Sequence, residues 1–148
     1  MTDEDDATAG TDAFEPDYVT DLQVRFRDID AMGHVNNAVY ATYLEQARAD
    51  YFADVVGERL HEVATVLVDL TVEYRRPIEW GEDVTVAVAV SALGESSLPM
   101  SYEVRADGDL AATAETVQVR VDDEGNATRI EDAWRERMRA ASAAGGEG

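Results

Sequence analysis

Two aspartates and one histidine, Asp28, Asp30 and His34, stand close together in the first quarter of the chain. Alternating apolar residues before them predict a strand, and the residues from Asn37 onward predict a helix, so the acids lie in the turn between the two. The first N–H groups of a helix lack partners within the helix and carry a partial positive charge. A carboxylate beside them can attack an electrophile, or deprotonate water, next to donors that stabilise an anion. This junction can therefore do chemistry.

The same residues also have structural roles open to them. Asp28 and Asp30 can each form a turn or cap a helix, and we expect this role for Asp28. Asn36 and Asn37 are of a type that caps helix N-termini. Gly33 permits a backbone conformation closed to other residues.

Nothing around the two aspartates predicts a metal centre. Only His34 adds a further ligand there, and the set falls short of a closed site. The chain has no cysteine, which excludes disulfides, thiolate metal sites and a cysteine nucleophile. We expect neither a metal nor a redox cofactor.

The helix expected over residues 37–56 follows directly from the turn. Its apolar stripe consists of Tyr40, Leu44, Tyr51 and Val55. Gly57 is well placed to end it. Arg48 lies within this stripe and needs a charged partner if it is buried, and Glu45, three residues earlier, is the partner we expect.

Period-two alternation indicates five strands, one over residues 18–27 and four after the helix. The second strand is predicted to place Val66, Val68, Leu70, Val72 and Tyr74 on one face. The last is predicted to use Ala111, Thr113, Val117, Val119 and Val121. A short helix over residues 131–140, anchored by Trp134 and Met138, follows. We expect an α+β fold in which a five-stranded antiparallel sheet, its last four strands a meander, wraps around one long central helix.

Composition divides the chain into an acidic disordered arm (1–17), one domain (18–141) and a flexible tail (142–148). The 32 acids and 12 bases, all arginine, give a net charge of −20, which argues against a nucleic-acid partner. Such self-repulsion is screened at molar salt, so the composition is typical of a halophilic cytoplasm. No apolar run approaches the roughly 20 residues of a membrane span and no signal segment is evident, so we expect a cytoplasmic protein away from membranes.

Two blocks of the sequence carry a family resemblance. The first reads Arg25-Phe26-Arg27-Asp28-Ile29-Asp30-Ala31-Met32-Gly33-His34-Val35-Asn36-Asn37 and continues through Tyr40, residues 43–48 and residues 51–52. The second covers residues 74–78 and 81–83. In order and spacing they resemble the hotdog-fold thioesterases, specifically the 4-hydroxybenzoyl-CoA thioesterase-like family of acyl-CoA thioester hydrolases, over residues 18–121.

The resemblance implies hydrolysis of acyl-CoA or acyl-carrier-protein thioesters, with coenzyme A present only as part of the substrate. Asp30 matches the family's catalytic carboxylate, which would attack the thioester carbonyl or activate water for that attack. Backbone amides near Asn37 match its oxyanion hole, and the Asn37 side chain could also hold the water or the carbonyl. His34 is a candidate acid or base, or a substrate contact.

Further site residues follow from the same match. The candidates for substrate contact are Gly33, Val35, Asn36 and Tyr40. Glu45 is the fallback carboxylate, because another branch of hotdog thioesterases uses an acid on the helix. Arg75, Arg76 and Arg120 could bind CoA phosphates or form surface ion pairs.

The family also implies that two protomers pair their sheets, in a homodimer or a tetramer, with active sites at the protomer interface. A non-catalytic hotdog protein that binds acyl thioesters is the alternative function. A hotdog dehydratase is a weaker one, because here the histidine precedes the helix that carries Glu45.

Overall fold

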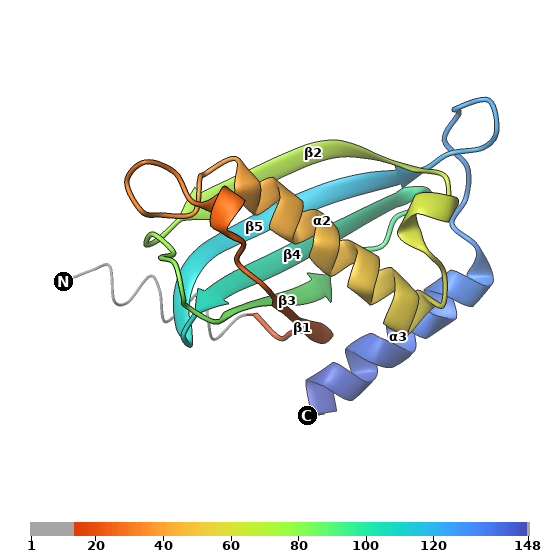
Figure 1. Ribbon diagram of the computed structural model, residues 1–148. Helices are drawn as coiled ribbons and strands as arrows, with labels where there is room; N and C mark the ends of the chain where they lie inside the picture. Colours follow the sequence, from red (N-terminus) through yellow and green to blue (C-terminus); the bar gives the residue numbers. More distant parts are fainter. Residues whose placement is uncertain (1–13, 148) are drawn as a thin grey trace.

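A computed structural model describes the backbone over residues 14–147 and the side chains over residues 14–142. The protein is built on one antiparallel sheet. Its strands are β1 (Tyr18–Leu22), β2 (Thr65–Tyr74), β3 (Val84–Val90), β4 (Ser97–Ala106) and β5 (Asp109–Arg120). Helix α2 (Val39–Tyr51), prolonged by the π-helical turn η2 (Phe52–Val56), crosses one face of the sheet (Figure 1). The predicted α+β hotdog fold is confirmed.

The strand order, β1-β3-β4-β5-β2, differs from the predicted meander of four strands. Only β3, β4 and β5 follow one another as neighbours, and β2 lies at the far edge beside β5. The reason is that β1 already occupies the other edge of β3, where Tyr18 pairs with Val88. The chain therefore crosses from one side of the sheet to the other between β2 and β3.

Strand β1 ends at Leu22, before the predicted boundary at Arg27. A single 3-10 turn, η1 (Phe26–Asp28), replaces its last residues. The Asp28 carboxylate closes this turn by accepting the Arg25 N–H at 2.9 Å. Asp28 thus has the predicted turn-supporting role.

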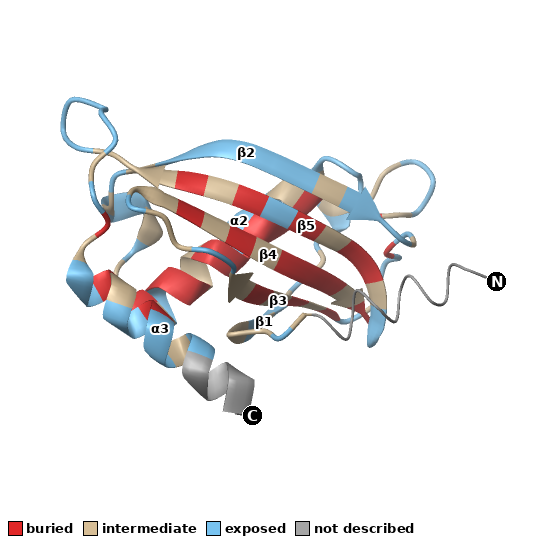
Figure 2. Ribbon diagram, turned by 180° about the vertical axis from the view of Figure 1, so that it is seen from behind, coloured by how far each residue is buried: buried red, intermediate tan, exposed pale blue. Residues whose placement is uncertain are grey.

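A β-bulge in β2 breaks the predicted alternation of its apolar residues. The register with β5 shifts between Leu67 and Asp69, so Leu67 and Leu70 both lie opposite residues that face the helix. Val66 falls on the other face, which makes the prediction of one continuous apolar face wrong. Most of this edge strand is exposed (Figure 2).

The face of β5 that packs toward the helix is also the opposite of the predicted one. Its buried alternate residues are Ala112, Ala114, Thr116 and Gln118. On the predicted face, Ala111 is buried, but Thr113, Val117 and Val119 are only half-buried. Small and polar residues suit the face toward the helix because the Thr116 hydroxyl bonds the buried Tyr102 hydroxyl at 2.7 Å.

The central helix ends where it was predicted to end, whereas the C-terminal helix continues beyond its predicted end. Gly57 adopts φ +83° and donates to the Phe52 carbonyl, so it ends the central helix as predicted. Trp134 and Met138 are buried and anchor α3 (Asp132–Glu147), whose backbone continues past the predicted end at Ala140. No helix among the described residues is long and apolar enough to cross a membrane.

The predicted division into arm, domain and tail stays a prediction. Residues 1–13 of the arm lie outside the described part of the chain. The boundary placed at residues 141 and 142 falls inside the backbone of α3.

Candidate active site

A hollow of about 360 Å³ lies at the N-terminus of α2, between the loop over residues 29–37 and the end of β2. It is lined by Asp30, His34, Val35, Asn37, Tyr40, Tyr74, Arg75, Arg76 and Pro77. Five of the residues predicted for catalysis or acyl contact, and two of the three arginines considered for phosphate binding, therefore share one hollow. Gly33 and Asn36 are exposed beside it, and Glu45 lies outside it.

Asp30 is held by the backbone of its own turn. Its Oδ1 accepts the N–H of Met32 at 2.9 Å and the N–H of His34 at 3.3 Å. Its Oδ2 accepts no hydrogen bond from the described residues. One oxygen thus fixes the orientation of the carboxylate while the other stays free to act.

The turn is attached to the segment that follows β2. Val35 is buried and donates its N–H to the Ile78 carbonyl at 2.8 Å, and His34 bridges to Glu79. Gly33 reverses the chain at φ +84°, the left-handed conformation predicted for it. Asp30 is therefore positioned by two chain segments that are more than forty residues apart in sequence.

One backbone N–H at the helix start remains available. The other donors there are paired: Asn36 N–H with Asp28 O, Ala38 N–H with Asn36 Oδ1, Val39 N–H with Asn36 O, and Tyr40 N–H with Asn37 O. The N–H of Asn37 finds no acceptor among residues 14–147, and Asn37 lines the hollow with Asp30. It stands where the partial charge of the helix favours an anion.

Two tyrosines form the wall opposite the acid. The Tyr74 hydroxyl donates to the Asn37 carbonyl at 2.9 Å, which ties the end of β2 to the helix start. The Tyr74 ring meets that of Tyr40 edge to face at 4.9 Å. Burial raises the pKa of Tyr40 to about 12, so the Tyr40 hydroxyl stays uncharged at neutral pH.

Asp28 faces away from this chemistry. In addition to the Arg25 N–H, its Oδ2 accepts the hydroxyl of Tyr43 at 2.8 Å. Burial, together with this bond to Asp28, raises the pKa of Tyr43. The two neighbouring aspartates thus differ in role, since one braces α2 and the other lines the hollow.

The predicted ion pair between Glu45 and Arg48 is wrong. Glu45 is exposed, whereas the buried Arg48 guanidinium donates to the Tyr102 hydroxyl at 3.3 Å. No carboxylate of the described residues lies within ion-pair distance of Arg48. The guanidinium extends toward β4 instead of along the helix.

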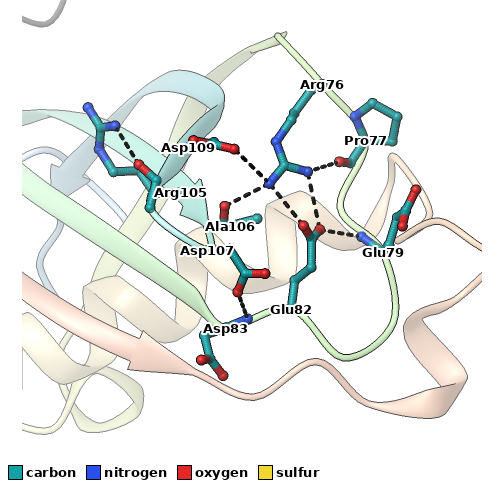
Figure 3. A network of polar contacts seen from close by, with 10 residues as sticks. Arg76, Pro77, Glu79, Glu82, Asp83, Arg105, Ala106, Asp107 and Asp109 are labelled. Atoms are coloured by element: carbon teal, nitrogen blue, oxygen red, sulfur yellow. Dashed lines mark hydrogen bonds and ion pairs between the residues drawn. The ribbon is translucent and has the colours of Figure 1, made fainter.

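The three arginines considered for phosphate binding are all paired with acids. Arg76 holds Glu82 through two hydrogen bonds, of 3.2 and 3.0 Å (Figure 3). Arg120 holds Glu131 in the same way, and Arg75 lies 3.6 Å from Glu73. Arg76 and Arg120 therefore form ion pairs within the chain that stabilise the fold.

Sequence reasoning did not assign Tyr74 or Pro77 to the site. Both belong to a block that carried the family resemblance, but only the tertiary structure brings the end of β2 beside the turn. Among residues 14–147 there is no group of three or more His, Cys, Asp or Glu side chains arranged to hold a metal ion.

Comparison with known proteins supplies a family. Residues 24–138 match the model of the thioesterase-like superfamily. The long-chain acyl-CoA thioesterase FadM of Escherichia coli is 30% identical over 108 residues, which are 70% of this chain and 82% of that protein.

Solved structures agree in fold over most of the chain. A thioesterase from Thermus thermophilus, solved in complex with coenzyme A and zinc, superposes with a TM-score of 0.81 at 40% identity, over 87% of this chain and 96% of that one. A DHNA-CoA thioesterase from Staphylococcus aureus gives a TM-score of 0.77 at 26% identity, over 88% and 93% of the two chains.

Proposed function

Because the chain belongs to the thioesterase-like superfamily, we propose that it hydrolyses acyl-CoA thioesters to a free acid and coenzyme A. Supporting relatives are the acyl-CoA thioesterase of Escherichia coli and the coenzyme A complex from Thermus thermophilus. The observation that carries the proposal is the pairing, in one hollow, of an oriented carboxylate on Asp30 with a free N–H on Asn37.

The thioester carbonyl oxygen sits at the Asn37 N–H, which stabilises the oxyanion formed when the carbonyl carbon is attacked. Asp30 Oδ2 serves that attack in one of two ways. Either it bonds to the carbonyl carbon and the thiolate leaves, after which water hydrolyses the mixed anhydride, or it takes a proton from water as water attacks. Label in Asp30 after a single turnover in ¹⁸O-water identifies the first way, because only hydrolysis of the anhydride at the Asp30 carbonyl labels the protein.

The remaining lining residues have supporting roles. Val35 and Tyr40 form the apolar wall beside the thioester, and the His34 side chain contacts the substrate or takes part in proton transfer. Gly33 and Asn36 shape the turn without lining the hollow, through a positive φ and through the bond from Ala38 N–H to Asn36 Oδ1.

The working form is a homodimer that pairs two β2 edges. Strand β2 carries five large apolar side chains between 38% and 57% exposed, namely Val66, Leu67, Val68, Leu70 and Tyr74. A long apolar edge strand is a template for pairing with a second strand. When two identical β2 edges pair about a two-fold axis, no β2 edge is left unpaired. Tyr74 lies on this edge and also lines the hollow, so the site borders the interface.

The test is hydrolysis of a panel of acyl-CoAs, and of the same acyl groups on carrier protein, by wild type, Asp30→Asn and Glu45→Gln in molar KCl. We expect Asp30→Asn to lower kcat by a factor of about 10²–10⁴, and Glu45→Gln to leave it unchanged. The asparagine keeps an oxygen for the N–H groups of Met32 and His34, so the turn should hold.

Two results would overturn this assignment. Full activity in Asp30→Asn with loss in Glu45→Gln would move the catalytic carboxylate to the helix. Tight binding of acyl-CoA by wild type without any hydrolysis would make the protein a non-catalytic thioester-binding member of the superfamily.

A further inference from the structure

A second hollow, of about 420 Å³, lies along α2 between the helix, the turn η3 (Leu60–Glu62) and the start of β2. Two nearly buried polar side chains line it, Arg48 at 4% exposure and Gln118 at 5%. This hollow is separate from the one that contains Asp30 and Asn37.

Both of these side chains have unused hydrogen-bonding capacity. Arg48 donates one bond, to the Tyr102 hydroxyl, and its buried Nε has no partner among the described residues. Gln118 donates to Thr65 Oγ1 at 3.0 Å, and its buried Oε1 has none. A buried guanidinium without a counter-charge is costly, and the cost is relieved when an anion binds to it.

Two exposed leucines of β2, Leu67 and Leu70, lie on the strand between the residues that line the two hollows. Leu67 and Leu70 lie opposite Gln118 and Thr116 in the sheet and so face the helix side, yet they are 41% and 38% exposed. They are uncovered because α2 starts near the end of β2 and then runs diagonally away from it (Figure 1). Leu67 lines the second hollow and Tyr74, farther along the same strand, lines the first.

The separation of the two ends suits an acyl chain. Arg48 lies eleven residues after Asn37, about 16 Å along the helix axis at a rise of 1.5 Å per residue. Side chains on a helix tilt toward its N-terminus, which brings the Arg48 guanidinium closer to the thioester position than its Cα. A chain that starts at Asn37 and follows the leucines therefore ends near a cation.

We propose that the acyl group lies along these two leucines and that Arg48 and Gln118 bind a carboxylate at its far end, so that the preferred substrates are CoA thioesters of dicarboxylic acids. Arg48 donates to the carboxylate through guanidinium N–H groups that its bond to Tyr102 leaves free. Because the Thr65 hydroxyl can donate as well as accept, the Gln118 amide can turn over and present its NH₂ group to the same carboxylate. This assignment rests on the proposed function, in which the substrate is an acyl-CoA thioester.

The experiment compares two CoA thioesters with the same number of carbons, octanoyl-CoA and the mono-CoA thioester of octanedioic acid, in molar KCl. For wild type we expect kcat/KM to favour the carboxylate-ended substrate about ten- to a hundredfold, the range that hydrogen bonds to a charged group supply. Arg48→Met, which keeps the length of the side chain, should abolish or reverse this preference. Arg59→Met removes an exposed arginine beside η3 and should retain it.

Gln118→Glu keeps the measurement decisive if Arg48→Met does not fold. A glutamate in the second hollow gives Arg48 a counter-charge from within the chain, so this variant should unfold at higher temperature than wild type. It should also lose the preference for the dicarboxylic substrate. A purely structural role for Arg48 predicts the gain in stability without the change in preference.

The inference fails if wild type shows an equal or lower kcat/KM for the carboxylate-ended substrate than for octanoyl-CoA, or if Gln118→Glu keeps the preference of wild type. It also fails if Arg48→Met is a monomer, because that result would assign Arg48 to contacts between copies. If neither thioester is hydrolysed, the wider acyl-CoA panel decides the proposed function. Calorimetric Kd values for the two intact thioesters then test the preference on their own.

Discussion

The ion pair between Arg76 and Glu82 ties the chain that follows β2 to the sheet. Arg76 donates to both carboxylate oxygens of Glu82 and also to the carbonyls of Pro77, at 2.8 Å, and Ala106, at 2.7 Å (Figure 3). Glu82 accepts in addition the N–H of Glu79 at 2.8 Å. Arg76 and Pro77 line the candidate active site, so this network supports one of its walls.

Glu82→Gln should lower the free energy of unfolding by about 1–2 kcal/mol at neutral pH. A fully buried pair loses about 3–5 kcal/mol when one partner is removed, and an exposed pair about 0–1. The side chains here are 29% and 19% exposed, which places them between these limits. Glutamine keeps an oxygen for the Glu79 N–H, and Arg76 keeps its two carbonyls, so the loss falls in the lower part of that interval.

The effect should depend on pH in one direction. The hydrogen bonds from Arg76 hold the pKa of Glu82 below its usual value of 4.5. A carboxyl whose pKa is lowered by folding stabilises the fold fully above its unfolded pKa, and this contribution is lost as the pH falls through the folded pKa. The difference between wild type and Glu82→Gln should therefore be constant near neutrality and shrink in acid below pH 4.5.

Urea unfolding in molar KCl, followed by circular dichroism across pH, measures both quantities. Glu73→Gln is the matched control, because Glu73 pairs with the adjacent Arg75 at 3.6 Å with side chains 69% and 38% exposed. We expect it to cost at most about 0.5 kcal/mol. A loss in Glu82→Gln no larger than in Glu73→Gln, or one that persists unchanged in acid, would refute the reasoning.

Two further predictions concern assembly and salt. Val68→Asp, on the exposed β2 edge, should convert the dimer to a monomer in light scattering. Val19→Asp, at a residue 54% exposed on the opposite edge strand β1, should leave the dimer intact. A dimeric Val68→Asp would exclude pairing through β2. The melting temperature should rise with KCl and level off near molar concentration, because screening removes the self-repulsion of a −20 chain; a melting temperature independent of salt would show that this repulsion is unimportant.

Local signals in the sequence were sufficient for the helix, its end and the identity of the turn. The spacing of Tyr40, Leu44 and Tyr51 defined a buried stripe, and Gly57 marked its end, because both depend on residues within a few turns of each other. The residues of the turn from Asp30 to Asn37 were likewise recognisable, since their order is specified by neighbours in the chain.

These local signals did not predict how distant strands pair. The bulge between Leu67 and Asp69 reversed the face of the residues before it, and the buried face of β5 proved to be the one with Thr116 and Gln118. Alternation tells which residues share a face but not which face meets the helix, because a shift of one residue in register exchanges the two.

For the site, sequence patterns indicated a candidate acid and the turn that carries it, and they placed the helix start two residues before its observed position at Val39. The packing of distant elements brings Tyr74 and Pro77 to the hollow, places Asp28 against Tyr43, and directs Arg48 away from Glu45 toward Tyr102. The physical reason is that burial and hydrogen-bond partners depend on which elements pack together. A sequence pattern alone does not specify these contacts, because they depend on the order of the strands in the sheet.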